Sequence, residues 1–147
     1  LYSSFNFFVE SVFSVIRYES YLPKSFFNCN NSFKWPPVDE INNTYVEPDI
    51  SVICDPNKLD DKGCKGAPDW IIEIVSPASR KMDYLLKLFK YHSAGVREYW
   101  IVDIAKNRIT VYNFNHDYSI EEYSFTDTVK AGIYEDLSID FSEINIL

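Results

Sequence analysis

The stretch that decides the fold is PDWIIEIVSPASRKMDYLLKLFKYHSAGVREYWIVD, residues 68–103. Its first part, Trp70 to Val75, is a near-continuous apolar run, which is typical of a buried strand. Ser76-Pro77 ends that run, and apolar residues at helical spacing follow. A second apolar run, Glu98 to Ile104, indicates another buried strand. Strand, helix and strand in this order favour a sheet with helices packed on it.

The helix in the middle of this stretch has recognisable ends. Ser79 is the expected N-cap, the helix should run to about Ser93, and Gly95 supplies the stop. Its predicted apolar stripe consists of Met82, Leu85, Leu86 and Phe89.

The rest of the chain adds further elements around this unit. Spacing predicts an amphipathic helix over 2–17 and strands over 32–34, 46–54, 108–114, 117–125 and, as a short edge element, 137–147. Residues 55–67 are expected to be a charged loop. The predicted fold is α/β (α+β), with a mixed central sheet flanked by helices.

Composition limits the class of protein. The 147 residues fit a single domain, 1–147, and the net charge of −8 argues against a protein that holds DNA by a broad basic face. Three cysteines without a CxxC pair favour a cytoplasmic protein without disulfides. No run reaches about 18 apolar residues, so no membrane span is predicted. Because Leu1 falls inside a helical pattern, we expect the chain to be truncated at its N-terminus.

Glu73 is the residue that asks for an explanation. It interrupts an apolar strand, and an ionised carboxylate that is buried alone costs several kcal/mol or more. A divalent metal is one partner that would offset this cost, and Asp49 from a neighbouring strand could be the second ligand. The alternatives are a solvated Glu73 on an edge strand and a turn-forming Asp49 after Pro48.

These residues also carry a family resemblance. Pro48-Asp49 followed by Glu73-Ile74-Val75 resembles the PD-(D/E)xK nuclease superfamily, in which two acidic residues on adjacent strands hold Mg²⁺. EPDISVICD and GAPDWIIEIVSPASRKMDYLLKLFKYHSAGVREYWIVD resemble more closely its Uma-two family of restriction endonucleases, over roughly residues 40–115. The resemblance implies a restriction-endonuclease-like sheet and Mg²⁺, or Mn²⁺, as cofactor. Asp49, Glu73 and the main-chain oxygen of Ile74 would be the metal ligands.

One position departs from the superfamily pattern. Val75 stands where the superfamily has a lysine, two residues after the second acid. In this branch the lysine lies on the following helix, and Lys87, four residues after Asp83, matches best. The resemblance thus makes Asp49, Glu73 and Lys87 the catalytic residues. The alternative for Lys87 is a surface pair with Asp83. Lys81 and Lys90 are the next candidates for the catalytic lysine after Lys87. Family members can also carry an acidic residue on the first helix, and Glu10 is the candidate for that position.

Other polar residues are interpreted as structural. Asp69 is expected to begin a strand, Glu98 to accept local hydrogen bonds, and His92 to be a packed or surface residue. Cys54 and Cys64 are expected to be unreactive thiols. A dimer could pool local basic patches for DNA, made from Lys58, Lys62, Lys65, Arg80 and Lys81.

Together with the family resemblance, the sequence favours a Mg²⁺-dependent endonuclease that hydrolyses DNA phosphodiester bonds; a homodimer is one possible assembly, and the oligomeric state stays open. Its rival is an inactive module that keeps the nuclease fold and binds nucleic acid or a protein partner. A third interpretation is an α/β domain unrelated to nucleases.

Overall fold

The computed structural model describes residues 33–34, 45–46, 48–60, 63–64, 66–75, 81–115 and 118–144. These ranges contain a five-stranded central sheet, three two-stranded ladders and one long helix. The helix predicted over 2–17 lies outside the described residues.

The central sheet is mixed, as predicted. In spatial order its strands are β3 (Ile50–Val52), β6 (Trp70–Val75), β7 (Glu98–Asp103), β8 (Arg108–Asn113) and β9 (Ser119–Tyr123). β6 and β7 run parallel, and every other neighbouring pair is antiparallel. The helix α2 (Lys81–Ala94) makes the crossover between the two parallel strands.

Local sequence explains where these elements end. Gly95 follows α2 with φ of +89°, a left-handed conformation that glycine adopts at little cost. After β7, the short 3₁₀ helix η2 (Ile104–Lys106) is capped by the Asp103 side chain. Asn107, with φ of 51°, completes the tight turn into β8.

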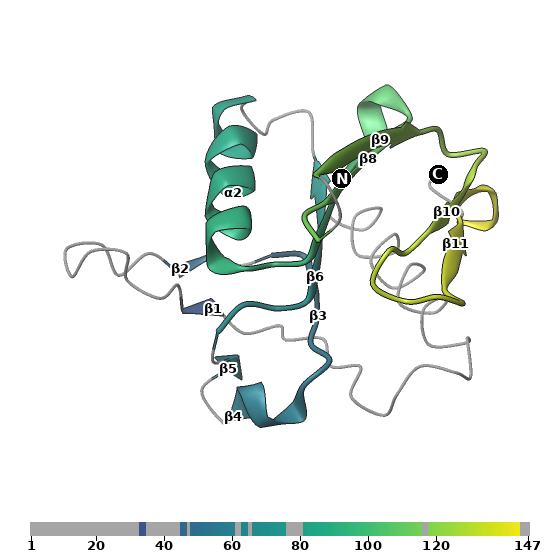
Figure 1. The fold of residues 1–147 in the computed structure, drawn as a ribbon. Coiled ribbons are helices and arrows are strands. Elements are labelled where there is room, and N and C mark those ends of the chain that lie inside the picture. Colours follow the sequence, from purple (N-terminus) through teal and green to yellow (C-terminus); the bar gives the residue numbers. More distant parts are fainter. Residues whose placement is uncertain are drawn as a thin grey trace.

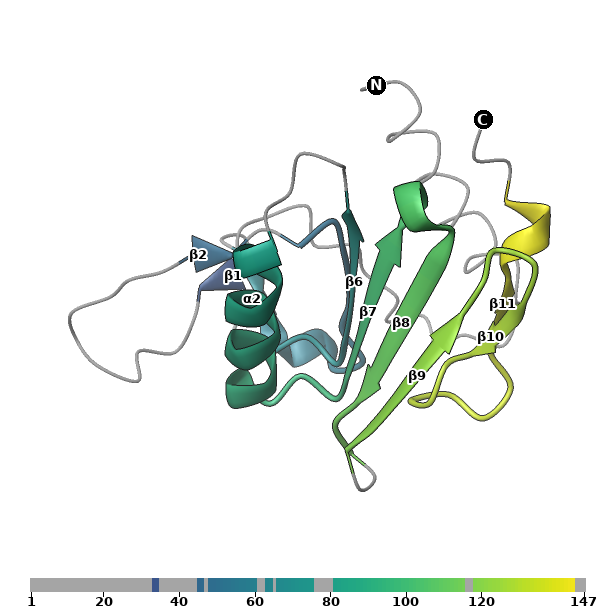
Figure 2. The same ribbon diagram turned by 90° about the horizontal axis from the view of Figure 1, so that it is seen from above.

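The two faces of the sheet have different covers (Figure 1). α2 lies on one face, and the antiparallel pair β10 (Thr128–Lys130) and β11 (Ser138–Asp140) lies on the other. Figure 2 shows the same layers from above. The core on the β10–β11 side is the larger one and contains Trp70, Trp100, Ile72, Val129, Ile139 and Phe141, the last from the 3₁₀ helix η3 (Phe141–Glu143). The core under α2 contains Ile53, Cys64, Ile71, Tyr91, Val96 and Tyr99.

The face that α2 buries differs from the predicted one. Leu85, Leu86 and Phe89 of the predicted stripe are 67%, 57% and 70% exposed. Tyr91 is fully buried instead, with Leu88 and Ala94 packed beside it. The helix is thus rotated so that polar atoms of this face meet Glu73 on the sheet, as described below.

The smaller elements also refine the prediction. The strand expected over 46–54 is divided into β2 (Tyr45–Val46), which pairs with β1 (Phe33–Lys34), and β3. Pro48, which has no N–H to donate, and a bend at Asp49 lie between the two pieces. The charged loop contains the 3₁₀ helix η1 (Pro56–Lys58) and the ladder of β4 (Leu59–Asp60) with β5 (Gly63–Cys64). The strand β10 was not predicted. No helix among the described residues has the length and apolar character needed to cross a membrane.

Candidate active site

Asp49 and Glu73 come together because β3 and β6 are antiparallel neighbours. Ile50 pairs with Ile72, so the next position along each strand places Asp49 opposite Glu73 on the same face of the sheet. Asp49 Oδ2 accepts a hydrogen bond of 2.7 Å from the main-chain N–H of Ile74. Asp49 is half-buried, whereas Glu73 is only 5% exposed.

Two side chains of α2 bind the two oxygens of Glu73. Lys87 Nζ lies 2.9 Å from Glu73 Oε2, and the Tyr91 hydroxyl donates to Glu73 Oε1 at 2.6 Å. Lys87 and Tyr91 are one helical turn apart, which puts both on the face that meets the sheet. The Lys87 side chain is 35% exposed and the Glu73 side chain 7%, so the lysine lies between the buried carboxylate and solvent.

The electrostatics of the acidic pair favour a bound cation. Burial raises the pKa of Glu73, while the charge of Lys87 and the hydrogen bond from Tyr91 lower it and the charge of Asp49 raises it further. Burial also raises the pKa of Asp49, against the N–H of Ile74 and the charge of Lys87. A divalent cation between the two carboxylates would relieve both the desolvation and the mutual repulsion.

The structure thus brings together the residues singled out from the sequence. Lys87 contacts Glu73. The alternative, a surface pair with Asp83, involves a side chain outside the described residues. Ile74 is at the site, where its N–H binds Asp49; its carbonyl oxygen as a metal ligand stays a prediction. Lys90 makes no ion pair with Glu73. Glu10 and the side chains of Lys81 and Asp83 lie outside the described residues.

Tyr91 is the site residue that the sequence reasoning missed. Its position one helical turn after Lys87 was a usable signal, because residues at this spacing share a helix face.

The donor set fits a hard divalent cation. Carboxylate oxygens are the ligands that Mg²⁺ prefers, and Mg²⁺ is commonly held by one or two carboxylates while it keeps several waters. Among the described residues no group of three His, Cys, Asp or Glu side chains is arranged to hold a metal. Two carboxylates suffice for Mg²⁺, which completes its shell with water, so the pair fits Mg²⁺ or Mn²⁺.

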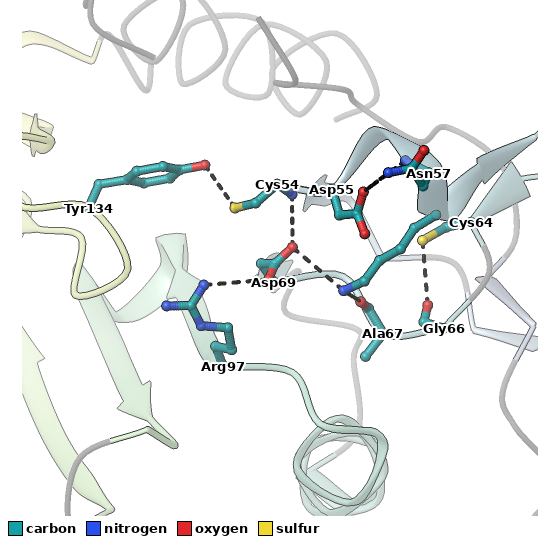
Figure 3. A network of polar contacts seen from close by, with 10 residues as sticks. Cys54, Asp55, Asn57, Cys64, Gly66, Ala67, Asp69, Arg97 and Tyr134 are labelled. Atoms are coloured by element: carbon teal, nitrogen blue, oxygen red, sulfur yellow. Dashed lines mark hydrogen bonds and ion pairs between the residues drawn. The ribbon is translucent and has the colours of Figure 1, made fainter. Parts of the chain in front are cut away.

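A second polar cluster surrounds Asp69 at the other end of the β3–β6 ladder (Figure 3). Asp69 Oδ2 accepts the N–H of Cys54 at 2.8 Å, and Asp69 Oδ1 lies 3.5 Å from Arg97 Nη1. Lys58 Nζ is 3.8 Å from Asp69 Oδ2 and donates to the carbonyl of Ala67. The cluster joins β3, β6, β7 and the η1 loop, which agrees with the structural role predicted for Asp69. Lys58, proposed for a basic patch, is engaged in this cluster.

Two thiols and a histidine lie near these sites. In the part of the chain that the structure describes, Cys54 and Cys64 form no disulfide. The Cys54 thiol lies 3.2 Å from the Tyr134 hydroxyl, and burial raises the pKa of this thiol. A raised pKa lowers the thiolate fraction and hence the reactivity. His92 is exposed and contacts the rings of Phe114 and Tyr118.

Glu98 is a buried carboxylate on the opposite face of the sheet. It accepts hydrogen bonds from Trp100 Nε1 at 2.6 Å and from the N–H of Ile133 at 2.9 Å. A Cβ on the neighbouring Gly132 would lie 3.1 Å from Glu98 Oε2 and 2.6 Å from Asn113 Nδ2, so a side chain at this position would have to displace the Asn113 amide. Glu98 therefore fastens the segment between β10 and β11 to the central sheet. The Trp100 bond is local, as predicted, and the Ile133 bond is not.

Comparison with known proteins agrees with the observed fold. The model of the Uma2 (Uma-two) family, described as "Putative restriction endonuclease", matches residues 12–142. The chain is similar to the crystal structure of "a putative nuclease belonging to DUF820 from Anabaena variabilis ATCC 29413". That match has a TM-score of 0.67 at 18% identity and covers 96% of this chain and 77% of the other, which is a likeness of fold. A search of curated proteins found no match. Because the family match spans most of the chain, from β1 to η3, this protein belongs to the Uma2 family.

Proposed function

We propose that the protein is a metal-dependent endonuclease that hydrolyses phosphodiester bonds in DNA. The observation that carries the proposal is Glu73, which is buried beside a second carboxylate and contacted by a lysine that reaches solvent. The family description and the nuclease-like fold support the same class of enzyme.

The residues have separate roles in this proposal. Asp49 and Glu73 would hold Mg²⁺ or Mn²⁺, with the Ile74 carbonyl as a further ligand. When bound, the metal supplies Lewis-acid stabilisation of the charge that develops on the phosphoryl oxygens. The N–H of Ile74 fixes Asp49, and the antiparallel register fixes Asp49 relative to Glu73, so the two carboxylates are placed before any ligand arrives.

Lys87 would act on the reacting groups. Its ammonium is anchored at Glu73 and partly open to solvent, where a phosphate can approach. From there it would position the water that attacks phosphorus and stabilise negative charge on the phosphate. Because the charge sits on a flexible four-carbon stem, Lys87 can move from Glu73 toward the substrate without moving the helix.

The test is cleavage of supercoiled and single-stranded DNA, with RNA in parallel, in Mg²⁺ or Mn²⁺. Wild-type protein should cut DNA, and chelator should abolish cutting. Glu73→Gln, which keeps the side-chain shape, should lose activity as completely as Glu73→Ala. Lys87→Met should lose activity but keep metal binding.

Two outcomes would contradict the proposal. Cutting that persists in both Glu73 variants would indicate a contaminating nuclease. Absence of cutting, together with absence of metal binding to the wild-type protein, would favour an inactive module that binds nucleic acid or a protein partner.

A further inference from the structure

Tyr91 stands out because its hydroxyl is buried and committed to one oxygen of Glu73. The side chain is 0% exposed, and its hydroxyl donates to Glu73 Oε1 at 2.6 Å. Lys87, one turn earlier, binds the other oxygen. The same helix face thus contacts Glu73 with one group that is fully buried and one that is partly open to solvent.

The Tyr91 ring is fixed from several directions. It packs edge-on against Tyr99 with ring centroids 5.0 Å apart and planes at 66°. Ile53, Ile71 and Val96 belong to the same buried cluster. The Tyr91 carbonyl accepts a hydrogen bond of 3.1 Å from the N–H of Val96, just after α2 ends. The position of the hydroxyl is therefore set by the core and does not depend on solvent or on Lys87.

We infer that Tyr91 is a positioning residue, which holds the Glu73 carboxylate in the orientation that receives a divalent cation together with Asp49. This inference rests on the proposed function, since it assigns a role toward the same metal. A carboxylate offers about four lone-pair sites, so one bond to Tyr91 leaves Glu73 with free sites for a cation.

The reason for two contacts on Glu73 follows from the task of Lys87. When Lys87 moves toward water or phosphate, as its flexible stem allows, its bond to Glu73 lengthens or breaks. A carboxylate held only by that lysine would then be free to rotate. The bond from the rigid Tyr91 keeps Glu73 Oε1 in place while Lys87 is engaged elsewhere, so the metal ligand does not follow the lysine.

The chain provides a matched control in Tyr99. It is also fully buried, packs against the same ring, and has a hydroxyl with no hydrogen-bond partner in the described part of the structure. Tyr91→Phe and Tyr99→Phe each remove one buried hydroxyl from the same cluster. Only the first removes a bond to Glu73.

The experiment is calorimetric titration of Mn²⁺ into metal-free protein, without DNA, for wild type, Tyr91→Phe and Tyr99→Phe. Removing a group that supports a metal ligand commonly weakens affinity by about 10–100-fold, and we expect a loss of this size for Tyr91→Phe. Tyr99→Phe should bind Mn²⁺ as wild type does. Thermal unfolding of each variant identifies a working temperature at which all are folded.

A second measurement distinguishes a misplaced Glu73 carboxylate from a general loss of structure in Tyr91→Phe. In cleavage assays, Tyr91→Phe should need a higher Mg²⁺ concentration for half-maximal rate and should recover much of the wild-type rate when Mg²⁺ is raised. A folded Tyr91→Phe protein that binds Mn²⁺ as tightly as wild type would overturn the inference and leave the proposed function standing. Wild-type protein that binds neither cation would overturn the proposed function, and the inference with it.

Discussion

The two Pro-Asp pairs of this chain occupy equivalent places in one ladder and have different surroundings. Asp49 precedes β3 and accepts the N–H of Ile74 near the end of β6. Asp69 precedes β6 and accepts the N–H of Cys54 just after β3. Since the strands are antiparallel, each aspartate closes one end of the ladder with a bond to the other strand.

The difference lies in what faces each aspartate. Across from Asp49 is Glu73, a second carboxylate. Lys87 forms an ion pair with Glu73, and its charge also lowers the pKa of Asp49. At the position that corresponds to Glu73 at the other end stands Ile53, and Asp69 has two cations, Arg97 and Lys58. Asp69 therefore has its charge balanced by the protein, whereas among the described side chains Asp49 and Glu73 share one cation, Lys87. The same dipeptide thus closes both ends of the ladder, and at one end it also belongs to the acidic pair that we propose binds a cation.

The sharpest way to break this comparison is to neutralise each aspartate in turn. Asp49→Asn should lower metal-dependent cleavage at least about 100-fold, because loss of a ligand should cost no less than loss of its support. Asp69→Asn should leave cleavage by folded protein close to wild type. Plasmid cleavage rates and Mn²⁺ titration measure both. Equal losses in the two variants would show that the ends of the ladder are not functionally distinct.

Stability should respond in the opposite order. Asp69→Ala leaves the N–H of Cys54 unpaired and Arg97 without its partner, and we expect a loss of about 1–3 kcal/mol in the free energy of unfolding. Asp49→Ala should cost less, because it also relieves repulsion between Asp49 and Glu73. Urea unfolding of both variants without metal gives the two values. A larger loss for Asp49→Ala would mean that this residue is chiefly structural.

Glu98 extends the comparison to a buried carboxylate that is contacted by the N–H groups of Trp100 and Ile133, with the charge of Arg97 acting on its pKa more weakly. Burial raises the pKa of Glu98 above the ordinary 4.5, so the folded protein binds a proton on this carboxyl group more tightly than the unfolded chain does. Its contribution to stability is present below that value and is lost as the pH rises through the folded pKa. The slope is at most about 1.4 kcal/mol per pH unit. As the pH rises from 4.5 through the raised pKa of Glu98, Glu98→Gln should therefore show a shallower fall in unfolding free energy than wild type. Urea unfolding at several pH values measures both slopes, and the same slope in Glu98→Gln and in wild type would refute this prediction.

The smallest effect is expected at Lys58. Its contact with Asp69 is 3.8 Å long and the lysine side chain is 33% exposed, so solvent screens the pair. Lys58→Met should lower the free energy of unfolding by less than about 1 kcal/mol. Thermal unfolding monitored by circular dichroism, with Asp69→Ala as reference, checks this. A loss as large as that of Asp69→Ala would mean that Lys58 accounts for most of the stability that the cluster around Asp69 contributes.

The sequence by itself determined the strand–helix–strand unit and its unusual carboxylate. An apolar run flanked by Ser-Pro, a helix that ends before glycine and a second apolar run are local patterns, and β6, α2 and β7 form where these patterns predict them. Glu73 was identifiable for the same reason, because an acid inside such a run needs a partner.

Tertiary structure decided which way the helix faces and which groups satisfy Glu73. Spacing alone predicted a stripe of apolar residues, yet Leu85 and Phe89 are exposed while Tyr91 is buried. Leaving a buried carboxylate without donors costs more than exposing individual apolar side chains, and the rotation of α2 places Lys87 and Tyr91 on Glu73. The different surroundings of Asp49 and Asp69 likewise depend on strand register and on residues distant in sequence, which no local pattern encodes.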